Sequence, residues 1–501
     1  MTWSSRVATN GPELYPSPGN SLTADRPARN IESRSRRPTL ATPYARRTTL
    51  LILLLLISVA VAACGSGSKG ESPSVPSAVE TTYDVTYTDG TTVIDQAEVD
   101  ASFLSVSDDG GEFRFRSSQA VRDLQPGQVV IFAGHALARV ISVGEEGGEL
   151  VVRTEPATLD EAISDGEISW RYPVKWQDLP PETFEAAAVA LAEAAVGVPV
   201  TDRMDASLAL AHPGAAPGFT LAQDGPGLHW SGEVKGFKVE VGFVPAADRL
   251  NFDLKATRSL PLGTSMSATA VGWITDFSQE TFLSYEDSTP TSFSSKAIGL
   301  EGELELTWAA AKLGEALTEI TSFKLPVSLP IPFTVGPIPV IIKVGANLQV
   351  VPELSVEEAS SGGSYKVKFN TDQGIEITGS SQTPFSDVKS TEIGVSGETV
   401  SAGFGVVGFA LGVEFPRLEI SVFGTTSAFI TLKTYSSSQW TPGTTLTGDI
   451  PPCQKGTTSL AAYAGYELSL LGFKLDEAVK ELWKREYEKF LNDRPCTLTG
   501  E

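Results

Sequence analysis

The stretch GLEGELELTW, residues 299–308, indicates the fold class because its side chains alternate between apolar and polar. Leucine or tryptophan occupies positions 300, 304, 306 and 308, and glutamate occupies positions 301, 303 and 305. A period of two is typical of a strand that buries one face and exposes the other. The stretch therefore predicts an antiparallel sheet with one side against a core.

The same period returns in three other stretches of the second half of the chain. They are FKVEVGF at residues 237–243, YKVKF at 365–369 and LEISVFG at 418–424. We therefore predict a large antiparallel β-sandwich or roll over residues 201–501. The pattern GFGVVG at 403–408 matches a dinucleotide-binding loop in letters only, because a strand-like stretch follows it where that loop needs a helix.

The most unusual internal stretch is LPVSLPIPFTVGPIPVIIKVGANLQV, residues 325–350, with five prolines and almost no charge. Proline at this density forbids a continuous helix or a central strand. We expect an irregular edge segment that leads into a buried strand from Val340. The alternative is an apolar lip for a lipid-like ligand.

Residues 79–176 contain short apolar runs separated by turn signals, including Asp89-Gly90 and Gly147-Gly148. These signals predict a small β-barrel or sandwich. Residues 177–200 are rich in Ala and Glu, with Pro180 and Pro181 near their start and Gly197 and Pro199 near their end, which predicts a linking helix.

The stretch LDEAVKELWKREYEKFLND, residues 475–493, has apolar residues at helical spacing with Lys and Glu between them. We expect a C-terminal amphipathic helix that lies on the large sheet.

Charge is distributed unevenly. The chain carries a net charge of −23, but its first 63 residues contain eight arginines and three acidic residues, a net charge of +5, so the remainder carries −28. Phosphate backbones would repel such a body, and we therefore expect no nucleic-acid partner.

Residues 50–63 form an uncharged apolar run that follows Arg46 and Arg47. Fourteen residues are too few to cross a bilayer, which needs about 20 in a helix. A basic start, an apolar middle and small residues at the end are typical of a secretory signal. The run closes with Val61-Ala62-Ala63-Cys64, which resembles the lipobox of bacterial lipoproteins.

This resemblance implies that Cys64 receives a diacylglycerol and that the signal is cut between Ala63 and Cys64. The body would then be exported and held on the cell membrane by its acyl chains. Residues 64–78 are rich in Gly, Ser and Pro and would form a flexible tether. Residues 1–49 would be a basic, disordered extension, or the translation start would lie further along the chain.

Lipidation of Cys64 would leave two of the three cysteines, Cys453 and Cys496. An even pair in an oxidising compartment predicts a disulfide; the alternative is two reduced, buried thiols. The histidines, His135, His212 and His229, are not at metal-ligand spacing from either cysteine, so we expect no metal site.

No catalytic motif emerges from the sequence, and we predict neither a catalytic residue nor a cofactor. The expected function is therefore that of a non-enzymatic, lipid-anchored surface protein for binding, adhesion or structure. Two alternatives stay open: a carrier of an apolar envelope ligand, and a hydrolase of envelope polymers that uses an unidentified carboxylate pair. The sequence gives no indication of the oligomeric state.

Overall fold

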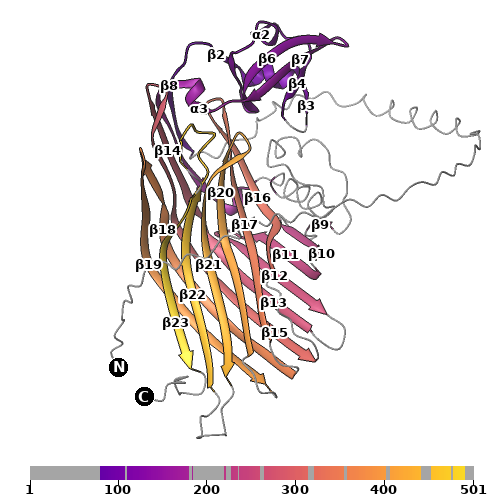
Figure 1. Cartoon of the computed structure of the whole chain (residues 1–501), viewed down its shortest axis with the longest axis vertical. Helices are drawn as coiled ribbons and strands as arrows, with labels where there is room; N and C mark the ends of the chain where they lie inside the picture. Colours follow the sequence, from indigo (N-terminus) through magenta and orange to yellow (C-terminus); the bar gives the residue numbers. More distant parts are fainter. Residues whose placement is uncertain are drawn as a thin grey trace, which may run out of the picture. The chain divides into compact units, whose positions relative to one another are not determined.

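The computed structural model describes residues 79–107, 110–179, 183, 219–221, 227–234, 236–259, 265–313, 321–354, 358–401, 407–441, 453–475 and 478–490. The chain divides into two compact units, Met1–Pro73 and Ser74–Glu501, and every described residue belongs to the second. These residues form three β-sheets and a few short helices (Figure 1). The predicted mainly β fold class is confirmed.

Of the predicted linking helix, residues 177–200, only residues 177–179 and 183 are described. The first two belong to a 3-10 helix, η1 Trp176–Asp178. The rest of this prediction lies outside the described residues.

The small β domain, residues 91–156, contains one six-stranded sheet in the order β2-β5-β6-β7-β4-β3. Strands β2 and β5 are parallel and the other neighbours are antiparallel. A two-residue turn, Gly147-Gly148, joins β6 to β7, and both glycines have positive φ, which only glycine adopts without cost. The elements are β2 Thr91–Ile94, α1 Gln96–Ser102, β3 Phe103–Val106, β4 Glu112–Phe115, α2 Gln119–Arg122, β5 Val129–Phe132, β6 Ala136–Glu146 and β7 Glu149–Pro156.

The largest sheet has eleven strands, and it includes the first and last strands of the predicted 79–176 domain, which pair with each other. Its main path is β1-β8-β14-β15-β13-β12-β11-β10-β9, and β18 and β19 continue from the other side of β15. The strands are β1 Glu80–Tyr87, β8 Ile163–Val174, β9 Phe219–Leu221, β10 Leu228–Val234, β11 Phe237–Pro245, β12 Arg249–Ser259, β13 Ser265–Thr275, β14 Phe277–Glu286, β15 Thr289–Leu313, β18 Glu358–Thr378 and β19 Ser381–Ser401.

Strand β15 organises this sheet, because β14 pairs with its first half and β13 pairs with its second half on the same side. A tight turn with positive φ at Asp287 and Ser288 joins β14 to β15. Between β13 and β14, the carboxylate of Asp276 accepts a hydrogen bond from the backbone N–H of Trp176 at 3.1 Å. The buried indole of Trp176 therefore lies where the sheet divides into two branches.

The third sheet has six strands in the order β16-β17-β20-β21-β22-β23. Strand β16 lies at the edge of its sheet, as expected for its prolines, and it pairs only with β17. The irregular segment predicted before Val340 is wrong, because these residues form a strand of fifteen residues. Pro330 and Pro332 are two positions apart, so the backbone nitrogens of both face away from β17. Proline has no N–H to donate, and its absence therefore costs β17 no hydrogen bond. The strands are β16 Thr321–Val335, β17 Ile338–Leu354, β20 Val407–Val422, β21 Thr425–Thr441, β22 Cys453–Tyr466 and β23 Ala478–Phe490.

The eleven-stranded and six-stranded sheets pack face to face around one apolar core. Phe252 of the first stacks on Phe415 of the second, with ring centroids 4.2 Å apart. The stretch that predicted the fold lies in β15, and its apolar residues at 300, 304, 306 and 308 are all at most 4% exposed. The predicted strands at 237–243, 365–369 and 418–422 are also present.

The predicted C-terminal helix at 475–493 is wrong. Ala478–Phe490 is strand β23, which pairs with β22 along its whole length. Trp483 faces the core and is 8% exposed, whereas the lysines and glutamates around it are exposed. The strand lies at the end of its sheet, where charged side chains prevent pairing with another chain.

Backbone hydrogen bonds join the small β domain to the sandwich. Helix α3 Leu159–Ala162, which starts with a capping box, donates from the Leu159 N–H to the carbonyl of Leu470 at 2.9 Å. The Gly134 N–H donates to the carbonyl of Pro337, in the β16–β17 turn, at 2.9 Å. The domain is thus fixed to turns at one end of the six-stranded sheet.

Candidate binding site on the six-stranded sheet

Most residues singled out from the sequence lie outside the described residues: Ala63, Cys64, His212 and Cys496. Cys453 is the first residue of β22. His135 lies in the turn between β5 and β6, where its ring contacts the carboxylate of Asp100 at 3.3 Å.

The register of β22 and β23 bears on the predicted disulfide. Lys455 pairs with Phe490, so the start of β22 lies beside the end of β23. Cys453 precedes Lys455 by two residues and Cys496 follows Phe490 by six. The fold thus places the start of β22, which carries Cys453, beside the last described residues of β23, whereas Cys496 lies outside the described residues.

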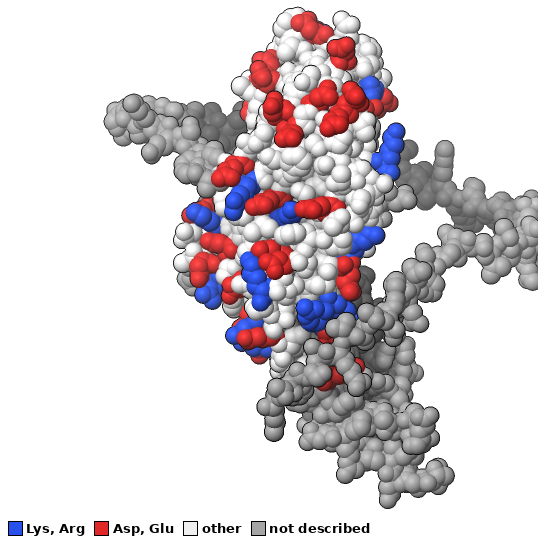
Figure 2. All heavy atoms as spheres, turned by 90° about the vertical axis from the view of Figure 1, so that its left-hand side faces the viewer, with Lys and Arg blue, Asp and Glu red and all other residues white. Residues whose placement is uncertain are grey.

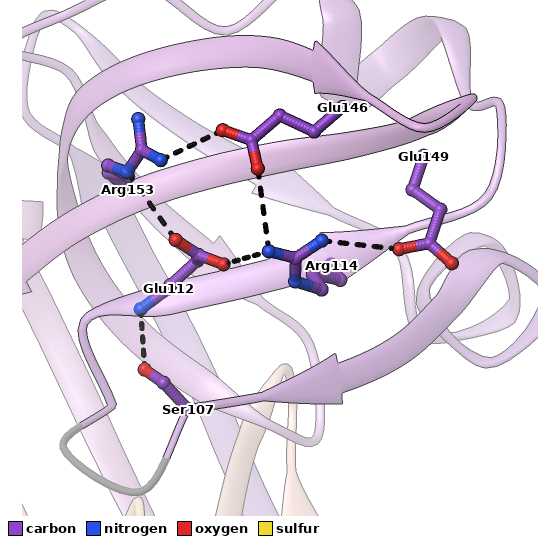
Figure 3. Close-up of polar contacts among 6 residues, drawn as sticks. All are labelled: Ser107, Glu112, Arg114, Glu146, Glu149 and Arg153. Carbon is purple, nitrogen blue, oxygen red and sulfur yellow. Dashed lines mark hydrogen bonds and ion pairs between the residues drawn. The ribbon is translucent and has the colours of Figure 1, made fainter.

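The small β domain carries a network of charged side chains on β4, β6 and β7 (Figure 3). Arg114 contacts three carboxylates, those of Glu112 at 2.5 Å, Glu149 at 3.4 Å and Glu146 at 3.5 Å. Arg153 bridges Glu146 at 2.9 Å and Glu112 at 3.4 Å. Each of these carboxylates is paired with a guanidinium, so the network holds the strands together and offers no free base.

A more deeply buried set of charges lies on the outer face of the six-stranded sheet. The Nε of Arg417 donates to a carboxylate oxygen of Glu419 at 2.6 Å, and one terminal nitrogen lies 3.6 Å from Glu414. The Asn347 amide donates to Glu414 at 2.7 Å. The guanidinium carbon lies 3.9 Å from the ring centroid of Phe429, a cation–π contact. We refer to these five residues as the Arg417 cluster.

Strand register explains why these side chains meet. Glu419 pairs with Phe429, so both lie in one row across β20 and β21. Phe429 pairs with Gly465, and a side chain at Gly465 would collide with the Phe429 ring, so glycine there lets the ring lie flat. A proline bulge at Phe415-Pro416, between Glu414 and Arg417, keeps both charged side chains on the outer face.

Burial distinguishes this cluster from an ordinary surface ion pair. The side chain of Glu419 is 10% exposed and that of Arg417 is 17% exposed. Charges held at this depth lose hydration and are fixed in place by their partners. The second terminal nitrogen of Arg417, Nη2, has no partner among the described residues. Chemically, the cluster presents a fixed guanidinium edge suited to a carboxylate, phosphate or hydroxyl oxygen.

An aromatic and apolar strip borders the cluster on β22 and β23. The Tyr463 hydroxyl donates to Glu481 at 3.3 Å, and burial, followed by the charge of Glu481, raises the pKa of Tyr463 to about 12. Val479 pairs with Gly465 and is 55% exposed. Planar polar groups, aromatic rings and an exposed apolar side chain thus adjoin on one rigid face.

Sequence reasoning missed this cluster although it identified the strand. The period of LEISVFG at 418–424 indicated which residues face outward, including Glu419. The proline bulge that puts Arg417 beside Glu414, and the pairing with Phe429, follow from strand order and register. Neither the bulge nor the pairing can be predicted from the sequence of one strand alone.

The predicted apolar lip does not form an open rim in the described part of the chain. Phe333 packs on Tyr172, with ring centroids 4.7 Å apart, and Ile338 is buried in the core. Ile338 lines a void of about 10 Å³ between the sheets. This void is too small for an acyl chain.

A carboxyl group with a raised pKa lies on the outer face of the eleven-stranded sheet. Burial raises the pKa of Asp253, and nearby His229 opposes the shift. Their side chains approach each other over Gly242, where a side chain would collide with both. Asp253 is more than a third exposed on an open sheet face, so this site lacks the cleft that a glycosidase needs.

Charge varies along the molecule in Figure 2. Acidic side chains predominate toward the upper end of this view, whereas lysines and arginines lie among them lower down. Ion pairs also join β15 and β18, among them that of Lys366 with Glu303. The acidic body predicted from the sequence is thus not uniformly acidic at its surface.

Within the described ranges, no set of three or more His, Cys, Asp or Glu residues is placed to hold a metal ion. The helices among those residues are all too short or too polar to cross a membrane.

Comparison with known proteins finds a family match for part of the chain. Residues 74–165 match the model of a family described as Domain of unknown function (DUF8403). The matched range covers β1, the small β domain and α3, and ends at the start of β8. No curated protein and no solved structure matched the chain.

Proposed function

We propose that this chain is a lipid-anchored protein of the bacterial cell envelope that acts by binding, with the Arg417 cluster as its recognition site. The observation that carries the proposal is the fixed geometry of that cluster. Three strands of one sheet hold a half-buried guanidinium between two carboxylates and an aromatic ring. Pre-positioned polar groups lose little conformational entropy when a ligand binds.

The ligand class follows from the chemistry of the cluster. A guanidinium edge takes acceptor oxygens, and Tyr463 and Val479 beside it give an aromatic and apolar contact surface. We therefore propose an oxygen-rich envelope polymer as the partner. The net charge of the chain, −23, makes a densely phosphorylated polymer a poor partner.

The attachment to the membrane rests on the lipobox resemblance at Val61-Ala62-Ala63-Cys64. The described body begins at Val79, fifteen residues after Cys64. An extended chain of this length reaches about 50 Å, so the tether would let the sandwich bind away from the bilayer surface. Diacylglycerol on Cys64 supplies two acyl chains, enough for stable anchoring.

We further propose that Cys453 and Cys496 form a disulfide at the open end of the β22–β23 pair. The adjacent register of Lys455 and Phe490 supports it, as does the oxidising compartment that export implies.

The anchor is tested by Cys64→Ser in the full-length chain expressed in a bacterium. We expect the variant to leave the membrane fraction and to lose labelling by a radioactive fatty acid, while Cys453→Ser keeps both. Membrane attachment of Cys64→Ser together with undiminished labelling would contradict lipidation at this residue.

Binding is tested by sedimentation of the lipid-free body, residues 65–501, with insoluble cell-wall material purified from a bacterium that carries this protein. We expect saturable co-sedimentation that excess soluble wall fragments displace. Recovery of all protein in the supernatant would contradict the proposed function.

A further inference from the structure

Two charges of each sign lie together at the Arg417 cluster. Glu414 and Glu419 contact the Arg417 guanidinium, and the Nζ of Lys433 lies 3.9 Å from Glu414. Lys433 belongs to the same face because it pairs with Glu414 across β20 and β21. The formal charges of these four side chains therefore cancel.

The neighbouring rows of the outer face keep this balance. Lys343 pairs with Glu419 from β17 and adds a positive charge, and Glu481 on β23 adds a negative one. Lys484, further along β23, forms an ion pair with Glu486. This part of the sheet thus has no excess positive charge with which to attract an anionic ligand.

An anionic oxygen beside Arg417 would also lie close to both glutamates of the cluster. The Nε of Arg417 is 2.6 Å from Glu419, and Nη1 is 3.6 Å from Glu414. Like charges repel at such separations as strongly as opposite charges attract, so two carboxylates offset the attraction of one guanidinium. The whole cluster therefore suits a carboxylate or a phosphate less well than an isolated guanidinium would.

A hydroxyl group can use both kinds of charged neighbour. Its oxygen accepts a hydrogen bond from Nη2 of Arg417, and its hydrogen is donated to a carboxylate. The Oε2 of Glu414 accepts from Asn347 at 2.7 Å, whereas Oε1 lies 3.9 Å from Lys433, beyond hydrogen-bond distance. Among the described residues, Oε1 of Glu414 is thus left to accept from a ligand.

The charged groups of the cluster can be reached from solvent. The side chains of Arg417, Glu414 and Lys433 keep 17%, 24% and 32% of their surface exposed. A ligand can therefore contact them at the surface of the sheet.

Tyr463 supplies the apolar contact that a sugar ring needs. It lies in the same row as Arg417, with Thr431 on the strand between them. Strands that are two apart in a sheet are roughly 10 Å from each other, a distance that about two linked sugar rings cover. The Tyr463 hydroxyl donates to Glu481 at 3.3 Å, which fixes the phenol beside the cluster. An aromatic ring with one polar end packs well against a molecule that has both apolar and hydroxyl groups.

We infer that the Arg417 cluster binds the hydroxyl groups of a neutral glycan, with Tyr463 against a sugar ring, and that it does not recognise carboxylates or phosphates. This inference rests on the proposed function and specifies the ligand class for the same site.

Chemically treated cell walls test the ligand class with the unaltered 65–501 body. Carbodiimide and borohydride convert carboxyl groups of the purified wall into alcohols, hydrofluoric acid removes phosphodiester-linked polymers, and periodate cleaves vicinal diols. We expect the dissociation constant to change less than threefold after either of the first two treatments and to rise at least tenfold after periodate.

The results separate this inference from the proposed function. Binding that weakens at least tenfold after carboxyl reduction or hydrofluoric acid overturns the neutral glycan but leaves wall binding in place. Undiminished binding to periodate-treated wall also overturns it. Absence of binding to the untreated wall contradicts the proposed function, and the inference with it.

Glu414→Gln adds a test in which the sign of the effect depends on the ligand. Glutamine removes the negative charge, so a neutral glycan should bind about threefold more weakly because it loses a charged acceptor. An anionic ligand should bind more strongly, and stronger binding would overturn the inference. Glu376→Gln, which alters an ion pair with Lys296 on the eleven-stranded sheet, is the matched control and should bind like the unaltered protein. The treated walls decide the question even if Glu414→Gln fails to fold.

Discussion

Arg417 contacts two glutamates and an aromatic ring, so its replacement should affect all three neighbours. We predict that Arg417→Met lowers the free energy of unfolding by about 2 kcal/mol, because Glu419 keeps its burial and loses its cation. In the double variant Arg417→Met, Glu419→Gln, more than half of this loss should return. Urea unfolding of the unaltered protein, the two single variants and the double variant gives the double-mutant cycle. Additive losses of unfolding free energy would show that the two side chains act separately.

Tyr463 predicts a dependence of stability on alkaline pH. Burial and Glu481 raise the pKa of Tyr463 to about 12 in the folded chain, whereas an unfolded tyrosine titrates near 10. The contribution of Tyr463 to stability is therefore complete below pH 10 and is lost as pH rises toward 12. The free energy of unfolding should fall by at most about 1.4 kcal/mol per pH unit on its account.

Tyr463→Phe should make this alkaline decline shallower in urea unfolding at pH 9.5, 10.5 and 11.5. Tyr487→Phe, which replaces a tyrosine that is 40% exposed on β23, serves as the control. An unchanged slope in Tyr463→Phe would contradict the raised pKa.

At the scale of elements, the strands of the sandwich were predictable because half-buried strands alternate in polarity. Residues 299–308 show this best, since each predicted inward position is buried in β15. The prolines of β16 likewise predicted its place at a sheet edge, although not that it forms a strand. These signals are local, so they can be recognised in the sequence without knowing which strands pair with each other.

Strand β23 could not be predicted in the same way. Its Lys and Glu residues prevent another chain from pairing with this edge strand. The same residue types also favour a solvent-exposed helix. Leu482 of β23 has no partner between the pairs of Trp483 with Ala462 and Glu481 with Tyr463, so a bulge at Leu482 breaks the period of two. Pairing with β22 decides the outcome, and that contact is not local.

The proposed disulfide at the end of the β22–β23 pair predicts a measurable contribution to stability. A bridge between Cys453 and Cys496 closes a loop of about 44 residues, which by chain entropy stabilises the fold by about 4 kcal/mol. We predict that Cys496→Ser lowers the free energy of unfolding by an amount in this range, and that reductant destabilises the unaltered body but not the variant. Alkylation of two thiols in the native, unreduced body would contradict the bridge.

At the scale of the whole molecule, two long sheets present their outer faces while the small β domain is fixed to turns at one end of the six-stranded sheet (Figure 1). The sequence predicted the mainly β fold, but not which face would carry the Arg417 cluster, and export and anchoring stay predictions. That information depends on the order β17-β20-β21-β22, which brings together residues about 120 positions apart.

The central claim is that the Arg417 cluster recognises an envelope polymer, and a sedimentation isotherm of Arg417→Lys tests it most directly. Lysine keeps the charge and loses the planar fork, so the fold should persist while recognition fails. We predict at least tenfold weaker binding of the 65–501 body to purified cell-wall material. Arg171→Lys, on the eleven-stranded sheet, should bind like the unaltered protein. Equal binding by Arg417→Lys and the unaltered protein would contradict the claim.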